Sequence, residues 1–234
     1  MIDIYTGTPG SGKSLHMAKD IRDMLCRGGL VISNFEISRD FLESKRCRGR
    51  AVHLSDKELF YPSDTAALIS YWVKNRSTKI LLCLDECQGL FNARTWNMAG
   101  RSEWVDFFAL HRHLSEERCR VILATQDDAS VDKQIRHKVE CEYKHYKIKN
   151  GSNAYFIFSM LFFGGNLFKY RWFWYGQKQH LGSSLFIGRK KLFKIYDTHA
   201  SFGGGPASGS AAMMKRAAEL LGEGGKEEAA SGNK

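Results

Sequence analysis

A glycine-rich loop directly behind an apolar opening segment is the feature that most constrains the fold of this chain. Residues 7–14 run Gly-Thr-Pro-Gly-Ser-Gly-Lys-Ser and follow the largely apolar residues 1–5. Glycines let a backbone curl so that successive N–H groups face the phosphates of a nucleotide, while the lysine reaches the β and γ oxygens and the serine binds magnesium. Apolar residues then recur at helical spacing from Lys13 to Arg27, so the N-terminus of a helix would face the same phosphates.

The strand, loop and helix together predict a site for ATP and Mg²⁺, and the alternative is a glycine-rich structural turn. We expect Lys13 to act on the phosphates during catalysis and Ser14 to bind the magnesium ion. The nucleotide-contacting residues that the motif predicts are Thr8, Pro9, Gly10, Ser11, Gly12, Lys13, Ser14 and Leu15.

Apolar strands alternate with amphipathic helices through the first part of the chain. A continuous apolar run at 80–84 is typical of a strand that is buried on both faces of a parallel sheet, and residues 30–33 and 121–124 are predicted to form further strands. The other predicted elements are a short segment at 52–54 and helices over 64–76, with Ser63 as N-cap, and over 103–114. The alternation predicts an α/β fold with a central, mainly parallel sheet that binds its ligand at the carboxyl ends of the strands.

The pattern changes from Val139 onward and indicates an antiparallel extension of the sheet. Its predicted strands are 140–149, 155–163, 167–175 and 192–196, separated by glycine-bearing turns. Glycine and serine then dominate residues 203–210, which predicts a flexible linker, and the tail to Lys234 holds one helical candidate at 211–221 and is otherwise typical of disorder. We therefore expect a nucleotide-binding core at 1–138, an extension of the same domain at 139–202, and a linker with a tail at 203–234.

Charge and apolar content bear on partners and compartment. The net charge is +10, and residues 170–194 carry six basic and no acidic side chains. Such a belt suggests an anionic partner, either nucleic acid or phospholipid, or a solvated face without a partner. The six cysteines are scattered, as in a reducing compartment, and the longest apolar run, 154–165, is shorter than the ~20 residues of a membrane-spanning helix. We expect a soluble or peripheral protein without a signal peptide.

Two polar stretches follow the buried strands and predict the catalytic half of the site. Asp85 and Glu86 come directly after the strand at 80–84, where Asp85 could hold Mg²⁺ through water and Glu86 could accept a proton from the attacking water. Gln126 follows the strand at 121–124 and could bind the γ-phosphate or the water. The alternatives are an Asp-Glu pair that caps a helix and a glutamine in an ordinary turn.

An arginine commonly neutralises the charge that develops during phosphoryl transfer, either from the same chain or from a neighbouring subunit. Arg94 and Arg112 are the two candidates that we carry forward, although each alone fits a surface or salt-bridge residue better than a catalytic arginine. Spacing alone does not separate them from the other candidates, Arg101, Arg118 and Arg136.

Rings and cations are interleaved near the C-terminal end of the predicted sheet. Residues 170–175 run Tyr-Arg-Trp-Phe-Trp-Tyr, and Lys178 and residues 189–191 add four cations. Single-stranded DNA binds such surfaces by stacking its bases on rings and pairing its phosphates with cations, and a membrane interface uses the same residue types. The period-two alternation also fits rings that form the buried face of a sheet.

The chain resembles the zonular occludens toxin family, which includes the assembly and export ATPases of filamentous bacteriophages. The matching features are residues 4–14, Asn34, residues 85–88 with Phe91 and Arg94, His111-Arg112-His113, Thr125-Gln126, Asp132 with Ile135-Arg136, and residues 192–197. The resemblance implies an additional-strand P-loop NTPase fold related to DNA-translocating motors. It also implies a ring-shaped homo-oligomer such as a hexamer, other phage assembly proteins as partners, and a place at the cytoplasmic face of the host inner membrane.

Members of that family usually place this domain ahead of a membrane-spanning helix. Because this chain ends in a glycine-rich linker and a tail, we expect any membrane contact to come from a partner or a segment outside this sequence. The function that we expect is an ATP-hydrolysing motor for the assembly and extrusion of filamentous phage virions. The alternatives are a non-hydrolysing ATP-dependent structural adaptor, a DNA-translocating or packaging ATPase, and a small-molecule kinase, for which Glu86 beside Asp85 fits less well.

Overall fold

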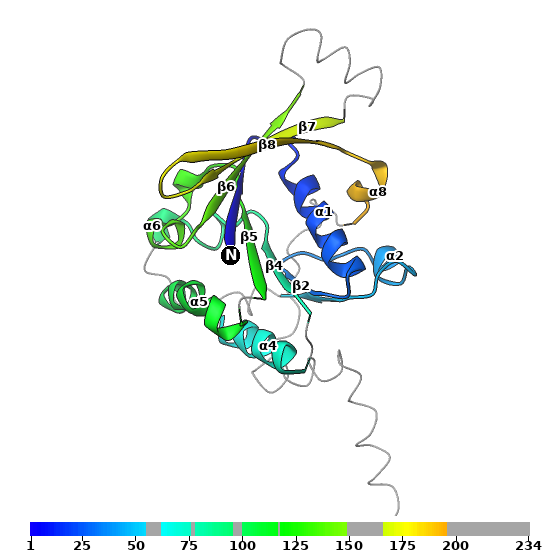
Figure 1. Ribbon diagram of the computed structural model, residues 1–234. Coiled ribbons are helices and arrows are strands. Elements are labelled where there is room, and N and C mark those ends of the chain that lie inside the picture. The colour runs from blue at the N-terminus through cyan, green and yellow to red at the C-terminus, as the bar shows by residue number, and fades with distance from the viewer. Residues whose placement is uncertain (55–61, 76–77, 96–99, 117, 149–165, 196–234) are drawn as a thin grey trace, which may run out of the picture.

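The computed structural model describes residues 1–54, 62–75, 78–95, 100–116, 118–148 and 166–195, and its strands form one eight-stranded sheet (Figure 1). The strands are β1 (Ile2–Thr6), β2 (Leu30–Ser33), β3 (Arg50–His53), β4 (Ile80–Leu84), β5 (Cys119–Ala124), β6 (Cys141–Lys147), β7 (Leu167–Trp174) and β8 (Gln179–Ile187). The helices are α1 (Lys13–Cys26), α2 (Arg39–Leu42), α4 (Pro62–Asn75), α5 (Arg101–Leu114), α6 (Lys133–Arg136) and α8 (Lys190–Phe193), with 3-10 turns at Ala93–Thr95 and Asp128–Ser130.

The strand order is β3-β2-β4-β5-β1-β6-β7-β8, and every pair from β3 to β6 is parallel. One strand, β5, lies between β1 and β4, which is the additional strand that the resemblance implied. Tyr5 of β1 is the cross-strand partner of Ala124 on β5, and Leu84 of β4 is the partner of Leu123 on β5. The carboxyl ends of β1, β4 and β5 therefore meet at one edge of the sheet, where an open α/β sheet binds its ligand.

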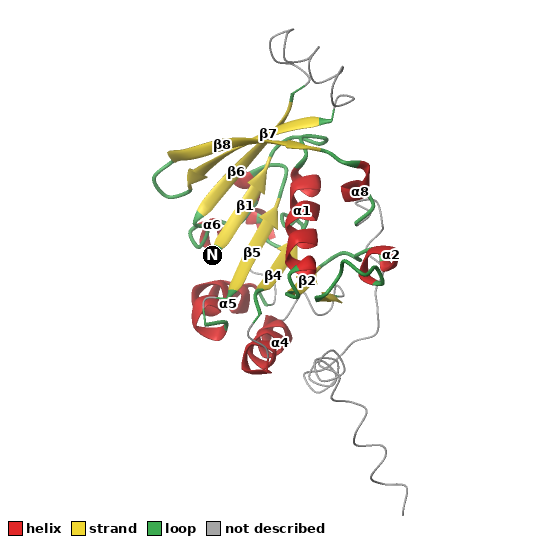
Figure 2. Cartoon of the chain, turned by 45° about the vertical axis from the view of Figure 1, so that its right-hand side comes forward, coloured by secondary structure: helices red, strands yellow, loops and turns green. Residues whose placement is uncertain are grey.

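Helices cover both faces of the parallel part of the sheet (Figure 2). Alternate residues of each strand point to opposite faces, so Leu30 and Ile32 join the core under α4 and α5 while Val31 joins the core under α1. Both faces of β4 are buried, which explains its uninterrupted apolar sequence. The predicted α/β class and mainly parallel sheet are confirmed.

Helix α1 is amphipathic, and its buried side chains pack on the sheet directly behind the loop that follows β1. Its buried apolar residues are Leu15, Met17, Ala18, Ile21 and Leu25. The helix ends at Cys26, and Gly28 follows with a φ of +83°, a left-handed conformation that glycine adopts without steric cost. These buried side chains anchor the helix, and with it the end of the loop, to the sheet.

The direction of β6 differs from the prediction. We expected residues 140–149 to begin an antiparallel extension, but β6 pairs in parallel with β1 and antiparallel with β7. Thr6, the last residue of β1, faces Lys144, so residues 145–147 of β6 extend beyond the end of β1. The antiparallel extension begins only at β7.

Two smaller predictions were also wrong, and one strand was missed. Residues 190–193 form the helix α8, whereas we expected a strand at 192–196, because Leu192 and Ile195 are buried at a helical spacing of three residues. The edge strand β8 escaped prediction because it is largely polar and exposed. Ser63 lies inside α4 and so is not its N-cap. The predicted strand at 155–163, the linker and the tail helix lie outside the described residues.

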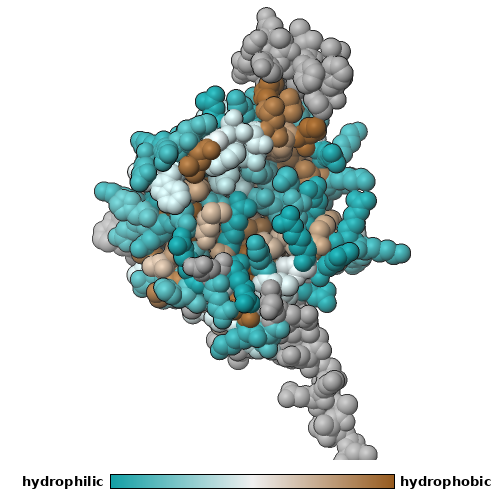
Figure 3. All heavy atoms as spheres, viewed as in Figure 1, coloured by the Kyte–Doolittle hydropathy of each residue, from teal (hydrophilic) through white to brown (hydrophobic). Residues whose placement is uncertain are grey.

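Apolar side chains are exposed among polar ones near β7 and β8 (Figure 3). On β8 they are Leu181, Leu185 and Ile187. The rings of β7 are divided between two environments, because Tyr170 stacks on the buried His16 while Trp174 is exposed. None of the helices in the described part of the chain combines the length and apolar character needed to cross a bilayer. All six cysteines are free thiols.

Candidate nucleotide-binding site

The loop between β1 and α1 has the backbone conformation that its glycines permit. Gly7, Gly10 and Gly12 have φ angles of +143°, +74° and +98°. A Cβ atom at Gly12 would lie 2.6 Å from the Phe168 ring, and one at Gly7 would lie 2.6 Å from the His145 carbonyl oxygen. These two positions exclude a side chain for both conformational and steric reasons.

A cavity of about 760 Å³ opens at this loop. Its lining comes from the loop and α1, from the segments that follow β4 and β5, and from the extension: Pro9, Gly10, Ser11, Gly12, Lys13, Ser14, Leu15, Ala18, Glu86, Gln126, Lys147, Asn166, Phe168, Leu192 and Phe193. Every loop residue predicted to contact nucleotide lines the cavity except Thr8, whose carbonyl oxygen accepts a hydrogen bond from the Ser11 N–H at 3.0 Å. Such a volume is ordinary for a small-molecule site.

Lys13 places a cation at the cavity. Its Nζ donates to the carbonyl oxygen of Gly7 at 2.6 Å, and it is a buried residue. Burial lowers the pKa of the Lys13 ammonium, while the nearby carboxylates of Glu86 and Asp85 act in the opposite direction and favour the charged form. The ammonium is therefore held next to the loop by carbonyl oxygens and by opposite charge.

The backbone of Asp85 is clamped by a side chain from the neighbouring strand end. Asn34 follows β2, donates from Nδ2 to the Asp85 carbonyl oxygen at 2.9 Å, and accepts at Oδ1 from the Asp85 N–H at 2.8 Å. Asp85 Oδ1 in turn accepts from the Glu86 N–H at 2.9 Å. Asn34 therefore fixes the acidic pair to the strand edge, a role that its place after β2 did not by itself reveal.

Glu86 has an unusual backbone and two amide partners. Its φ of +47° lies in the left-handed region, which is uncommon for a residue with a long side chain. Gln126 Nε2 donates to Glu86 Oε1 at 3.4 Å, and the Gln88 amide donates to the other carboxylate oxygen. Glu86 and Gln126 thus line the same cavity as the phosphate loop. Strained backbone conformations such as that of Glu86 are concentrated at functional sites.

The candidate arginines lie in different places. Arg94 is exposed in the turn after β4. Arg112 pairs with Glu140 at 2.5 Å at the amino end of the sheet, opposite the loop. Arg101 is buried, pairs with Asp132 at 3.5 Å and donates to the Leu90 carbonyl oxygen, which ties down the segment after Glu86.

Five residues of the extension line the cavity, and sequence reasoning missed all of them: Lys147, Asn166, Phe168, Leu192 and Phe193. The parallel direction of β6 carries Lys147 to the same edge as the carboxyl ends of β1, β4 and β5. Its Nζ lies 5.8 Å from the centre of the Phe168 ring, its cross-strand partner on β7. A correct prediction of the direction of β6 would have identified Lys147 and Phe168 as residues near the loop.

A neutral histidine pair lies behind the loop. His16 Nδ1 and His145 Nε2 are 2.9 Å apart, and His145 Nδ1 is 3.2 Å from the Thr6 carbonyl oxygen. Because that carbonyl can only accept, His145 carries its proton on Nδ1 and accepts from His16 at Nε2. The His16 ring stacks between Tyr5 and Tyr170, with centroids 4.9 and 4.2 Å away. Burial lowers the pKa of both histidines to about 3.

Acid should therefore destabilise the fold through this pair. Each histidine has a depressed pKa in the folded state, so its contribution is fully present above the unfolded value of 6.5 and is lost as pH falls toward 3. We expect up to about 1.4 kcal/mol per pH unit for each histidine. Urea unfolding of the wild type between pH 7 and pH 4 measures the slope.

The double variant His16→Gln/His145→Gln isolates this effect, since Asp3 and Glu142, whose pKa values burial raises, contribute with the opposite sign and remain in both proteins. The variant should be less stable at pH 7 but have a shallower dependence on pH. His180→Gln, at an exposed position on β8, should keep the wild-type slope. An unchanged slope in the double variant contradicts the assignment.

Comparison with known proteins identifies the family. A family model described as zonular occludens toxin (Zot) matches residues 1–160. The Gene 1 protein of Enterobacteria phage I2-2 is 31% identical over 152 residues, which are 59% of this chain and 39% of the relative. The Gene 1 protein of Enterobacteria phage M13 is 32% identical over 148 residues, covering 58% and 40%. The chain thus spans about two fifths of the length of the curated relatives that it matches.

The fold agrees with a solved structure of the same family. The N-terminal domain of zonular occludens toxin from Neisseria meningitidis superposes with a TM-score of 0.51 at 19% identity, covering 84% of this chain and 98% of that domain. At this identity the likeness shows the fold alone. The family model covers more than half of the chain, and the chain belongs to the zonular occludens toxin family.

Proposed function

We propose that this protein is a magnesium-dependent ATPase that powers the assembly and extrusion of filamentous phage virions. The observation that carries the proposal is the shared cavity: a phosphate loop with Lys13 forms one wall, and Glu86 with Gln126 forms another. Phosphate binding and water activation are the two tasks of nucleotide hydrolysis, and this arrangement offers side chains for both.

The residues of the cavity fit ATP and Mg²⁺. Ser11 Oγ, in the loop itself, is buried without a hydrogen-bond partner among the described residues, so its hydroxyl can donate to a phosphate oxygen. Lys13 would contact the β and γ oxygens, while Ser14 and, through water, Asp85 would hold Mg²⁺. The ion, when bound, neutralises charge on the β and γ oxygens.

Glu86 is the group that we assign to the attacking water. Its carboxylate would accept the proton as the water oxygen bonds to the γ-phosphorus and the bond to the β-phosphate oxygen breaks, releasing ADP and phosphate. Gln126 would hold Glu86 and the γ-phosphate in one place through its amide. The Asn34 clamp keeps Asp85 and Glu86 at the strand edge.

Assembly into a ring would complete the site. Arg94 is exposed after β4, and Arg112 lies far from the loop of its own chain, so an arginine for the γ-phosphate would come from a neighbouring subunit. Membership of the Zot family supports phage assembly proteins as partners, DNA or coat protein as cargo, and the cytoplasmic face of the host inner membrane as the place of work.

Phosphate release per subunit, measured against protein concentration, tests the motor proposal. An intersubunit site predicts a rate per subunit that rises with concentration, and Arg94→Ala should lower the plateau about 1000-fold. Arg39→Ala, another exposed arginine, is the matched control and should leave the rate unchanged. A rate that stays flat with concentration contradicts the intersubunit site. ATP binding without phosphate release at any concentration supports a structural adaptor instead.

Loss of the clamp should lower the rate without lowering affinity. In Asn34→Ala both backbone groups of Asp85 lose their hydrogen bonds to Asn34, and losing one such bond typically costs about 1–3 kcal/mol. We expect kcat to fall about tenfold while the Kd for ATP changes less than about threefold. Steady-state kinetics and calorimetric titration measure the two, with Asn75→Ala on α4 as control. Wild-type kcat in Asn34→Ala excludes a positioning role for the clamp.

A further inference from the structure

The two ends of the cavity have different chemistry. Lys13, Glu86 and Gln126 form the polar end at the strand edge. Toward the body of α1 the lining changes to Leu15 and Ala18, which face α8. A triphosphate bound at the loop would therefore leave the rest of the nucleotide to extend along the first turns of α1, toward the apolar end.

Helix α8 forms the outer wall of that apolar end and is anchored from both sides. Leu192 and Ile195 are buried against the core that includes α1, and the Ser38 N–H donates to the Ile195 carbonyl oxygen at 2.7 Å. At the other end a Cβ on Gly188 would lie 2.8 Å from Leu15 and Phe168, so the turn that leads into α8 is closely packed. The helix is thus a fixed wall.

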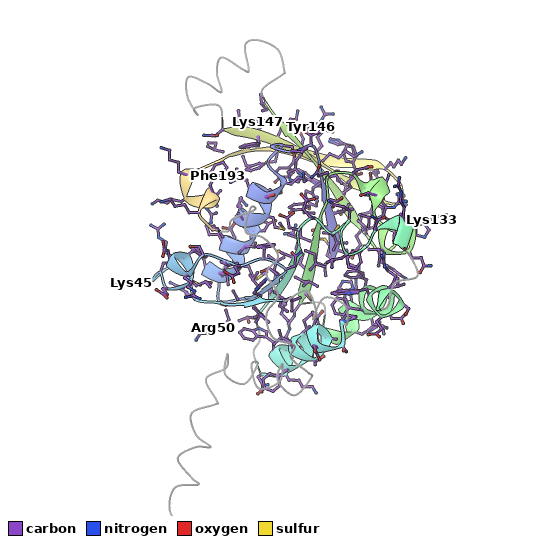
Figure 4. All side chains as sticks on the ribbon, turned by 180° about the vertical axis from the view of Figure 1, so that it is seen from behind. Lys45, Arg50, Lys133, Tyr146, Lys147 and Phe193 are labelled. Carbon is purple, nitrogen blue, oxygen red and sulfur yellow. The ribbon has the colours of Figure 1, made fainter. Side chains whose placement is uncertain are left out.

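Phe193 is exposed, in contrast to the buried Leu192 and Ile195 on either side of it. It belongs to the cavity lining, yet 54% of the residue is exposed, while its neighbour Leu192 is 4% exposed. Figure 4 shows Phe193 on α8 and Lys147 at the end of β6, both near the N-terminal end of α1. Single exposed apolar residues are common on protein surfaces, but this one lines the same cavity as a phosphate loop.

We propose that Phe193 is the stacking platform for the nucleobase of the bound nucleoside triphosphate. The inference rests on the proposed function, because it assumes that the phosphates lie at the loop. Every base has a flat π-face, and stacking on an aromatic side chain stabilises it without reading its hydrogen-bonding edge. Leu15 and Ala18 supply the apolar surface across from the ring. The anchored α8 holds the ring at the cavity before the base arrives, which limits the entropy lost on binding.

Titration of wild type and variants with Mg-ATP and with Mg-tripolyphosphate tests the platform. Tripolyphosphate carries the phosphates without the base, so the two ligands separate base contacts from phosphate contacts. Phe193→Ala should weaken ATP about tenfold, at the lower end of the range for base stacking, and change tripolyphosphate less than about twofold. Phe193→Trp should keep wild-type affinity for ATP. Leu185→Ala, which removes another exposed apolar side chain away from the cavity, should alter neither.

Two outcomes overturn the platform. One is wild-type affinity of Phe193→Ala for ATP, and the other is an equal loss of ATP and tripolyphosphate, which assigns Phe193 to the shape of the cavity. The variant Lys13→Ala separates this failure from that of the proposed function. If Lys13→Ala loses affinity for both ligands while Phe193→Ala binds ATP as the wild type does, the phosphate site is supported and the stacking role of Phe193 is refuted. If Lys13→Ala binds both as the wild type does, the phosphate site itself is refuted.

Discussion

Lys13→Ala is expected to weaken ATP binding about 100-fold and to reduce phosphate release to background. The Lys13 ammonium is the cation that the phosphate loop itself holds at the cavity, 2.6 Å from the Gly7 carbonyl oxygen. A charged hydrogen bond to phosphate contributes about 1.5–3 kcal/mol, and the upper half of that range corresponds to about two orders of magnitude in Kd. Calorimetric titration with Mg-ATP measures the change directly.

Lys45→Ala is the matched control, because this exposed lysine beyond α2 does not line the cavity. Figure 4 shows it on a different part of the molecule from Lys147, which does. It should bind ATP as the wild type does. The thermal unfolding midpoint of Lys13→Ala should stay close to that of the wild type without nucleotide, since no apolar contact of the core is removed. Wild-type ATP affinity in a folded Lys13→Ala protein would refute the assignment of the loop.

Glu86→Gln has the second large expected effect, and it should separate binding from hydrolysis. The substitution keeps the size of the side chain and its contact with Gln126 but removes the group that accepts a proton. General-base catalysis contributes about 10²- to 10⁴-fold, so we expect kcat to fall about 1000-fold. The Kd for ATP should change less than about threefold, because Glu86 faces the water rather than the phosphates in the proposed arrangement.

The control for this variant is Glu43→Gln, at an exposed carboxylate next to α2. Single-turnover phosphate release and nucleotide titration on the same samples give the two quantities. If Glu86→Gln hydrolyses ATP at more than a tenth of the wild-type rate, another group activates the water. If it loses ATP binding as well, the positive-φ turn at Glu86 serves the shape of the site instead.

Local patterns made the central part of this architecture predictable. The glycines of the loop are needed where φ is positive. The apolar runs 80–84 and 121–124, which precede Asp85 and Gln126, are buried because helices cover both faces of the sheet. Each of these signals lies within a few neighbouring residues. The meeting of Glu86 with Gln126 then follows from parallel strands whose carboxyl ends share one edge.

Features decided by distant partners were not predictable in the same way. An alternating strand looks the same whether it runs parallel or antiparallel, and only pairing with β1, some 138 residues away in the Asp3 to Cys141 register, gives β6 its direction. That direction brings Lys147 to the cavity. Leu192 and Ile195 suit either a short strand or a helical turn, and the choice depends on packing against the core that includes α1. The Asn34 clamp likewise needs Asp85 on the adjacent strand.

Phosphate release by the wild-type protein with Mg-ATP is the most direct test of the central claim that this cavity hydrolyses nucleotide. The measurement compares the wild type with Glu86→Gln over a range of protein concentrations, with and without single-stranded DNA, after ATP binding has been verified for both proteins. We predict Mg²⁺-dependent release by the wild type and about 1000-fold less by the variant. Equal release by the two proteins, or none from a wild type that binds ATP, contradicts the account.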